Sequence, residues 1–311
     1  MTRIAMIAAA IGCGLAGACL YLAVLIGSPG ALILVYLTQL PLFLAGLWLG
    51  TGAAAVAGVS AVAVMLAVSD VTGAILFAVL NAAPVVLLVR QALLARPDAD
   101  RSVVWYPPGL LVAGLTLLAL AGMAAAIVLM GGPDGLQATL TGIVGHALDR
   151  LTARPLPDRD AVAATIAGIV PGTIALSWMM MAVVNAVLAQ GLLVRFGGNW
   201  RPSPDLAALT LPSWLAILLG GAAAATLVGG AARFIGVNVM IALFLPFCLA
   251  GLAVLHVAAR RLANPVPALV AFYTMSGVFG WPLLAVAVLG LLENWLGLRR
   301  RLAPSGGTID G

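Results

Sequence analysis

Residues 4–26 read IAMIAAAIGCGLAGACLYLAVLI, a stretch with no charged side chain. A helix of about 23 residues is about 35 Å long, which is enough to cross the hydrocarbon core of a bilayer. Bulky isoleucine and leucine side chains share one face, and the opposite face is a shallow strip formed by Ala5, Ala9, Gly12, Cys13 and Ala16. In lipid, such a strip lets another backbone approach closely, and van der Waals packing then drives association. We therefore predict a first transmembrane helix that docks either onto later helices of the chain or onto a partner protein.

The composition places the whole chain in the membrane. Of 311 residues, 63% are hydrophobic and 8% are charged, and the mean hydropathy is +1.17. A water-soluble domain carries about 25% charged residues. The net charge of +5 does not indicate a nucleic-acid partner, because the arginines stand at the ends of apolar segments, where they set topology. The lipid bilayer is thus the first predicted partner.

Apolar segments continue almost to residue 302. We predict an all-α fold, a polytopic transmembrane helical bundle of about 8–10 helices with one interfacial amphipathic helix. The predicted parts are an N-terminal transmembrane bundle (residues 1–131), a periplasmic or interfacial amphipathic connection (132–161), a C-terminal transmembrane bundle (162–302) and a disordered tail (303–311). In the connection, Leu136, Leu140 and Ile143 recur at helical spacing, which predicts a helix lying on the membrane surface.

Two later segments contain prolines that interrupt a regular helix. Residues 162–194 are long for one span, and we predict a kink at Pro171. Residues 266–292 should break at Trp281–Pro282. The arginines at segment ends favour a cytoplasmic N-terminus. Nine spans would place the arginines at 299–301 outside, so either the break at Trp281–Pro282 returns the chain or one short segment before residue 68 is miscounted. We prefer a cytoplasmic C-terminus.

Few residues of the sequence are candidates for catalysis or for binding a metal ion or cofactor. Residues 12–17, GCGLAG, match the dinucleotide-binding pattern, but that pattern requires a preceding strand and an exposed helix start, and these glycines fall within an apolar segment. His146 and His256 have no cysteine or glutamate at ligand spacing. We predict no catalytic residues, metal site or cofactor, and hence no enzyme. The glutamate Glu293 is expected to pair with Arg299 or Arg300 at the membrane edge.

The feature that stands out is a sparse set of amides at membrane depth. They are Gln39, Asn81, Asn185 and Asn238, and the first two stand close to prolines. An amide in hydrocarbon must find a partner, and nearby prolines release backbone carbonyls that can line a cavity. These residues are our candidate pocket for a small neutral or zwitterionic solute. The alternative is that each amide only joins helices to one another.

The second half of the chain resembles the YybS-like family of uncharacterised bacterial membrane proteins. The motifs that carry this resemblance are Val170-Pro171-Gly172, Leu211-Pro212-Ser213-Trp214, Gly251-Leu252-Ala253-Val254 and the ending Leu289-Gly290-Leu291-Leu292-Glu293-Asn294-Trp295. It covers roughly residues 160–302. Where the family tends to have a second acidic residue near this end, the chain has Asn294. The resemblance implies a multi-pass protein of the bacterial inner membrane.

The first half is similar to the substrate-binding subunits of energy-coupling-factor transporters. Those subunits dock onto a transmembrane coupling protein through small residues on their first helix. Ala8, Gly12 and Ala16 are the matching positions here, so the similarity implies a membrane-protein partner that supplies energy.

These observations lead to two functional hypotheses. The first is an inner-membrane protein that binds a small solute and helps to transport it with a partner. The alternative is a membrane scaffold or assembly factor with no solute. Neither hypothesis involves nucleic acid.

Overall fold

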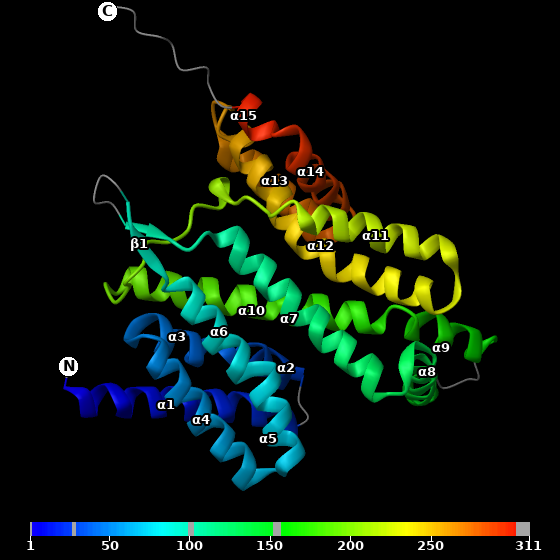
Figure 1. Ribbon diagram of the computed structural model, residues 1–311, viewed down its shortest axis with the longest axis horizontal. Coiled ribbons are helices and arrows are strands. Elements are labelled where there is room, and N and C mark those ends of the chain that lie inside the picture. The colour runs from blue at the N-terminus through cyan, green and yellow to red at the C-terminus, as the bar shows by residue number, and fades with distance from the viewer. Residues whose placement is uncertain (1, 27–28, 99–102, 152–156, 303–311) are drawn as a thin grey trace, which may run out of the picture. The chain divides into compact units, whose positions relative to one another are not determined.

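The structure is a computed structural model that describes residues 2–26, 29–98, 103–151 and 157–302 (Figure 1). Nearly all of these residues are helical, which confirms the predicted all-α class. The tail 303–311, for which we predict disorder, lies outside the described residues. The chain divides into two compact units: unit 1 comprises Met1–Leu115 and Trp178–Pro204, and unit 2 comprises Thr116–Ser177 and Asp205–Gly311. The units therefore interleave along the chain, whereas the bundles predicted from the sequence are consecutive.

Unit 1 holds most of the N-terminal helices. Its elements are α1 (Arg3–Leu22), a 3-10 turn (Ala23–Ile26), α2 (Pro29–Tyr36), α3 (Gln39–Leu49), α4 (Thr51–Val68), α5 (Val71–Phe77), a π-helical turn (Ala78–Ala82), α6 (Ala83–Ala92), and strands β1 (Ala95–Pro97) and β2 (Val103–Trp105). The two strands pair antiparallel. Two further helices, α7 (Pro108–Leu129) and α10 (Val170–Arg195), contribute residues to both units.

Unit 2 is built around the long helix α12 (Gly230–Ala259), which packs against α11 (Trp214–Val228) and α14 (Pro282–Leu296) (Figure 1). Its other elements are α8 (Gly132–Leu151), α9 (Arg159–Ala167), a 3-10 turn (Leu206–Ala208), α13 (Pro265–Phe279) and α15 (Leu298–Leu302). Helices α12 and α14 meet at Gly251 and Gly290, where an added Cβ would overlap the Val286 and Phe247 carbonyls respectively. Glycine is required at this crossing because the two backbones are in contact.

Seven helical segments among the described residues are long and apolar enough to cross a membrane. They are Arg3–Leu22, Gly30–Leu49, Thr51–Val68, Val71–Ala92, Pro108–Leu129, Val170–Arg195 and Gly230–Ala259. The pair α13 and α14 would add an eighth, but it is bent by 117°. The bend occurs at Gly280, whose φ of +69° suits glycine, and it confirms the predicted break at Trp281–Pro282. The protein is thus a multi-pass helical membrane protein.

The kink predicted at Pro171 is wrong, because the segment 162–194 is not one helix. It contains two helices, α9 and α10, which are separated at Gly168–Ile169. Pro171 is the second residue of α10. A proline is tolerated there because the first N–H groups of a helix have no partner within it.

Helix α1 docks onto α4 and α3 of its own unit (Figure 1). The buried face consists of Ala10, Gly14, Gly17 and Ala18. A Cβ at Gly14 would overlap Ser60 Oγ and the Ala57 carbonyl of α4. The positions Ala8, Gly12 and Ala16 remain exposed, and no atom lies within 4 Å of a Cβ built on Gly12. Intramolecular docking therefore uses small residues on a neighbouring face of the helix.

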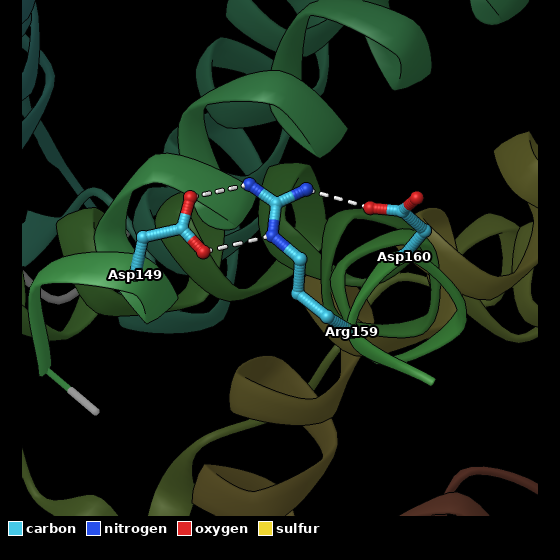
Figure 2. A network of polar contacts seen from close by, with 3 residues as sticks. All are labelled: Asp149, Arg159 and Asp160. Atoms are coloured by element: carbon cyan, nitrogen blue, oxygen red, sulfur yellow. Dashed lines mark hydrogen bonds and ion pairs between the residues drawn. The ribbon is translucent and has the colours of Figure 1, made fainter. Parts of the chain in front are cut away.

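Helix α8 begins and ends within the predicted amphipathic connection. It packs against α9, and Arg159 joins the two helices, as Figure 2 shows. Asp149 accepts hydrogen bonds from Arg159 at 2.9 and 2.6 Å, and Asp160 accepts one at 2.6 Å. These hydrogen bonds hold the pKa of the Asp149 carboxyl below its ordinary value. The position of α8 at the membrane surface stays a prediction.

The α8–α9 corner should therefore loosen in acid. Because folding lowers the Asp149 pKa, its contribution is fully present above about pH 4 and is lost as the pH falls further. We expect the protection of the α8 and α9 amides against hydrogen exchange, taken relative to the intrinsic exchange rate at the same pH, to fall below that pH, and Asp149→Asn to lower this protection already at pH 7. Asp160→Asn, which removes one hydrogen bond instead of two, is the control with the smaller effect. Equal protection in Asp149→Asn and the unaltered protein would contradict the assignment.

Candidate functional site

A break in the second membrane segment positions the first part of the site. Helix α2 ends at Tyr36 and α3 begins at Gln39. The Leu40 N–H bonds to the Leu37 carbonyl at 3.0 Å, as in a 3-10 turn, and does not continue an α-helix to Tyr36. Pro41, the next residue, has no backbone N–H and therefore cannot donate a helical hydrogen bond. The Tyr36 carbonyl instead accepts Nδ2 of Asn185 from α10 at 2.6 Å.

A second irregularity faces the first. The π-helical turn Ala78–Ala82 precedes Pro84, which has no N–H to donate to the Leu80 carbonyl. That carbonyl accepts Nε2 of Gln39 at 3.2 Å and Nε1 of Trp178 at 2.8 Å. Gln39 Nε2 also lies 3.4 Å from Asn81 Oδ1. Turns of this kind are frequent at functional sites, and here one directs a backbone oxygen towards α3 and α10.

Three buried oxygens of this region have no hydrogen-bond partner among the described residues: Thr38 Oγ1, Gln39 Oε1 and Asn185 Oδ1. All three residues are 0% exposed. Leaving such a group unpaired costs about 1–3 kcal/mol, so an unpaired set calls for an explanation. The side-chain amide nitrogens of Gln39 and Asn185 already donate to backbone carbonyls. Their unpaired amide oxygens can only accept hydrogen bonds. A ligand here would have to supply N–H or O–H donors.

We name Thr38, Gln39, Asn81 and Asn185 the amide cluster. The structure places all four in unit 1 and buries each of them. Gln39 and Asn81 are in contact, and Asn185 bonds to the helix break beside Thr38. Three of the four amides chosen from the sequence thus gather around the two helix irregularities, while the pocket itself stays a prediction.

Asn238 belongs to unit 2, and both polar atoms of its side chain make hydrogen bonds. Its Oδ1 accepts the Gly172 N–H at 2.7 Å, and its Nδ2 donates to the Gly168 carbonyl at 2.8 Å. In a continuous helix, Gly172 would bond to Gly168 directly. The amide therefore bridges the break between α9 and α10, and its Nδ2 also bonds to Phe234 of its own helix at 2.8 Å.

Sequence reasoning did not select Thr38, Trp178 or the Leu80 carbonyl. One of these had a readable signal: a carbonyl four residues before a proline loses its helical donor, and Leu80 stands at that distance from Pro84. Trp178 had no such signal in the sequence, because its hydrogen bond to the Leu80 carbonyl joins residues 98 positions apart.

A buried arginine also lies in unit 1 but has a structural role. Arg201 is 6% exposed and donates to the carbonyls of Ala92 and Tyr106 at 3.0 and 2.9 Å. Burial lowers the pKa of its guanidinium. Through these bonds Arg201 ties the end of α6 to the segment between β2 and α7.

The fold and the amide cluster define a polytopic helical membrane protein with a buried polar region between broken helices. The residues that the structure describes contain no group of His, Cys, Asp and Glu side chains that could hold a metal ion. In comparisons with known proteins, no family model, curated protein or solved structure matches the chain.

Proposed function

We propose that this is a bacterial inner-membrane protein, with a cytoplasmic N-terminus, that binds a small neutral or zwitterionic solute at the amide cluster. The observation that carries the proposal is the set of three fully buried, unpaired oxygens beside two helix irregularities. In membrane transporters, irregular backbone at membrane depth is tolerated where it is buried or lines a cavity. The amide cluster has no formal charge, which favours a solute that donates hydrogen bonds over an anion.

The protein would bind its solute and leave the supply of energy to a partner. The similarity of the first half to the substrate-binding subunits of energy-coupling-factor transporters supports a membrane-protein partner of this kind. The exposed positions Ala8, Gly12 and Ala16 are the proposed docking strip for it.

A second candidate function is a scaffold or assembly factor that binds no solute. The observation that favours it is the same exposed strip on α1, because small residues allow close approach of a helix from another protein. In this case the amide cluster would only join α3, the π-helical turn and α10.

Thermal unfolding of the purified protein with a panel of amino acids, nucleobases and vitamins separates the two functions. A solute at one hundred times its Kd adds about 2.7 kcal/mol of stability, which raises Tm. Thr38→Val removes one unpaired hydroxyl at nearly constant shape. We expect it to leave the solute-free Tm unchanged or higher and to reduce the rise in Tm caused by the solute.

Ser276→Ala is the matched control, because Ser276 carries a buried, unpaired hydroxyl in unit 2. This variant should keep the full response to the solute. If no compound of the panel raises Tm, the scaffold is favoured. If a compound raises Tm equally in Thr38→Val and the unaltered protein, the amide cluster is not its site.

A further inference from the structure

Unit 2 contains a cavity of about 420 Å³ at the C-terminal end of α14. The segment from Ala207 to Leu211 forms one wall, and the residues from Gly290 to Arg300 form another. Asp205 fixes the first wall, since its carboxylate accepts the Ala207 N–H at 2.9 Å. Gly297, with φ of +56°, allows the chain to turn from α14 into α15. The cavity is therefore shaped by defined local structure.

A buried ion pair lines this cavity and confirms that Glu293 pairs with Arg299. Glu293 Oε1 accepts Arg299 Nε at 2.8 Å, and Glu293 Oε2 accepts the Arg299 backbone N–H at 3.0 Å. The two side chains are 9% and 13% exposed. Arg299 Nη1 reaches across to the Ala207 carbonyl at 2.6 Å. Both carboxylate oxygens are thus already bonded to Arg299, and the pair carries no net charge.

Besides the exposed hydroxyl of Thr210, the polar side chains of the lining that remain are those of Asn294 and Arg300. The Nδ2 of Asn294 is buried and has no hydrogen-bond partner among the described residues. Arg300 also lines the cavity and is exposed. An amide N–H and a guanidinium both donate hydrogen bonds, and Arg300 gives the lining its positive charge. A ligand that satisfies them needs acceptor oxygens and a negative charge.

We propose that this cavity binds a phosphate group, which comes either from an anionic lipid headgroup or from a soluble phosphate ester. Guanidinium groups bind phosphate oxygens through short, charge-assisted hydrogen bonds. The volume falls within the range of small-ligand sites, so it accommodates a phosphate with a glycerol-sized substituent. Basic pockets at the ends of membrane helices hold lipid headgroups in this way. The cavity shares no residue with the amide cluster, because its lining belongs to unit 2.

The test uses the full-length protein in a neutral detergent and three probes. Dioctanoyl phosphatidylglycerol carries headgroup and chains, sn-glycerol 3-phosphate carries the phosphate alone, and dioctanoylglycerol carries the chains alone. We expect titration calorimetry to detect binding of at least one phosphate probe and none of dioctanoylglycerol. Binding of the lipid alone identifies a headgroup site, and equal binding of glycerol phosphate identifies a site for soluble esters.

Arg300→Ala should weaken the affinity about tenfold through loss of a charge-assisted bond. Asn294→Asp, which replaces the unpaired donor by a carboxylate, should weaken it at least as much. Arg301→Ala is the control, because Arg301 is exposed but does not line the cavity; its affinity should stay within about twofold. The proposal is overturned if no phosphate probe binds, if dioctanoylglycerol binds equally well, or if Arg300→Ala and Arg301→Ala behave alike. Because Arg300 is exposed, the comparison stands even where Asn294→Asp fails to fold.

Discussion

Replacement of Asn238 by leucine is expected to lower the free energy of unfolding by about 2–4 kcal/mol. The variant loses an acceptor for the Gly172 N–H and a donor for the Gly168 carbonyl at the same time. Both backbone groups belong to the break between α9 and α10, where a Cβ on Gly172 would come within 2.7 Å of the Asn238 carbonyl oxygen.

Thermal or denaturant unfolding of the purified protein measures this effect. Asn264→Leu is the matched control in the same unit, because Asn264 is exposed and its side chain makes no capping bond to α13. It should change the stability by less than about 0.5 kcal/mol. Equal losses in the two variants would show that the bridge at Asn238 contributes little.

Asn238 and Asn185 show which properties of a buried amide can be predicted from the sequence. An amide in an apolar segment is readable from the sequence, because hydrocarbon forces it to find a partner. Its role is not readable, since the role depends on which carbonyl it meets. Asn185 reaches a carbonyl 149 residues away and keeps an unpaired oxygen. Asn238 uses both ends of its amide to close a break in another helix. The same residue type thus serves a candidate site in one unit and a structural bridge in the other.

The breaks at Trp281–Pro282 and at Gly168–Ile169 were not predicted equally well from the sequence. The break at Trp281–Pro282 was readable because a proline stands inside an otherwise apolar segment. The break at Gly168–Ile169 was misplaced as a kink, although Pro171, which has no N–H to donate to the Ala167 carbonyl, stands next to it. Pro171 was a true signal, but it marked the start of a helix and not a bend within one.

The second large loss of stability is expected for a substitution in helix α1. Gly14→Leu should lower the free energy of unfolding by at least about 3 kcal/mol, since even its Cβ would overlap Ser60 Oγ and the Ala57 carbonyl of α4. Backbone atoms cannot yield as the end of a flexible side chain can, so the two helices must separate. The measurement is again the unfolding of the purified protein, supported by the amount of folded protein that can be extracted.

Gly12→Leu is the natural control, only two positions away on the same helix. No atom lies within 4 Å of its Cβ, so stability should change by less than about 0.5 kcal/mol. The sequence could not separate these two glycines, because alanine and glycine surround the helix at positions 8–10, 12, 14 and 16–18. Only the partner helix decides which face is used.

If Gly12, together with Ala8 and Ala16, is the docking strip, Gly12→Leu should prevent membrane proteins from copurifying while leaving the fold intact. A loss of stability as large as that of Gly14→Leu would show that the strip packs within the chain itself.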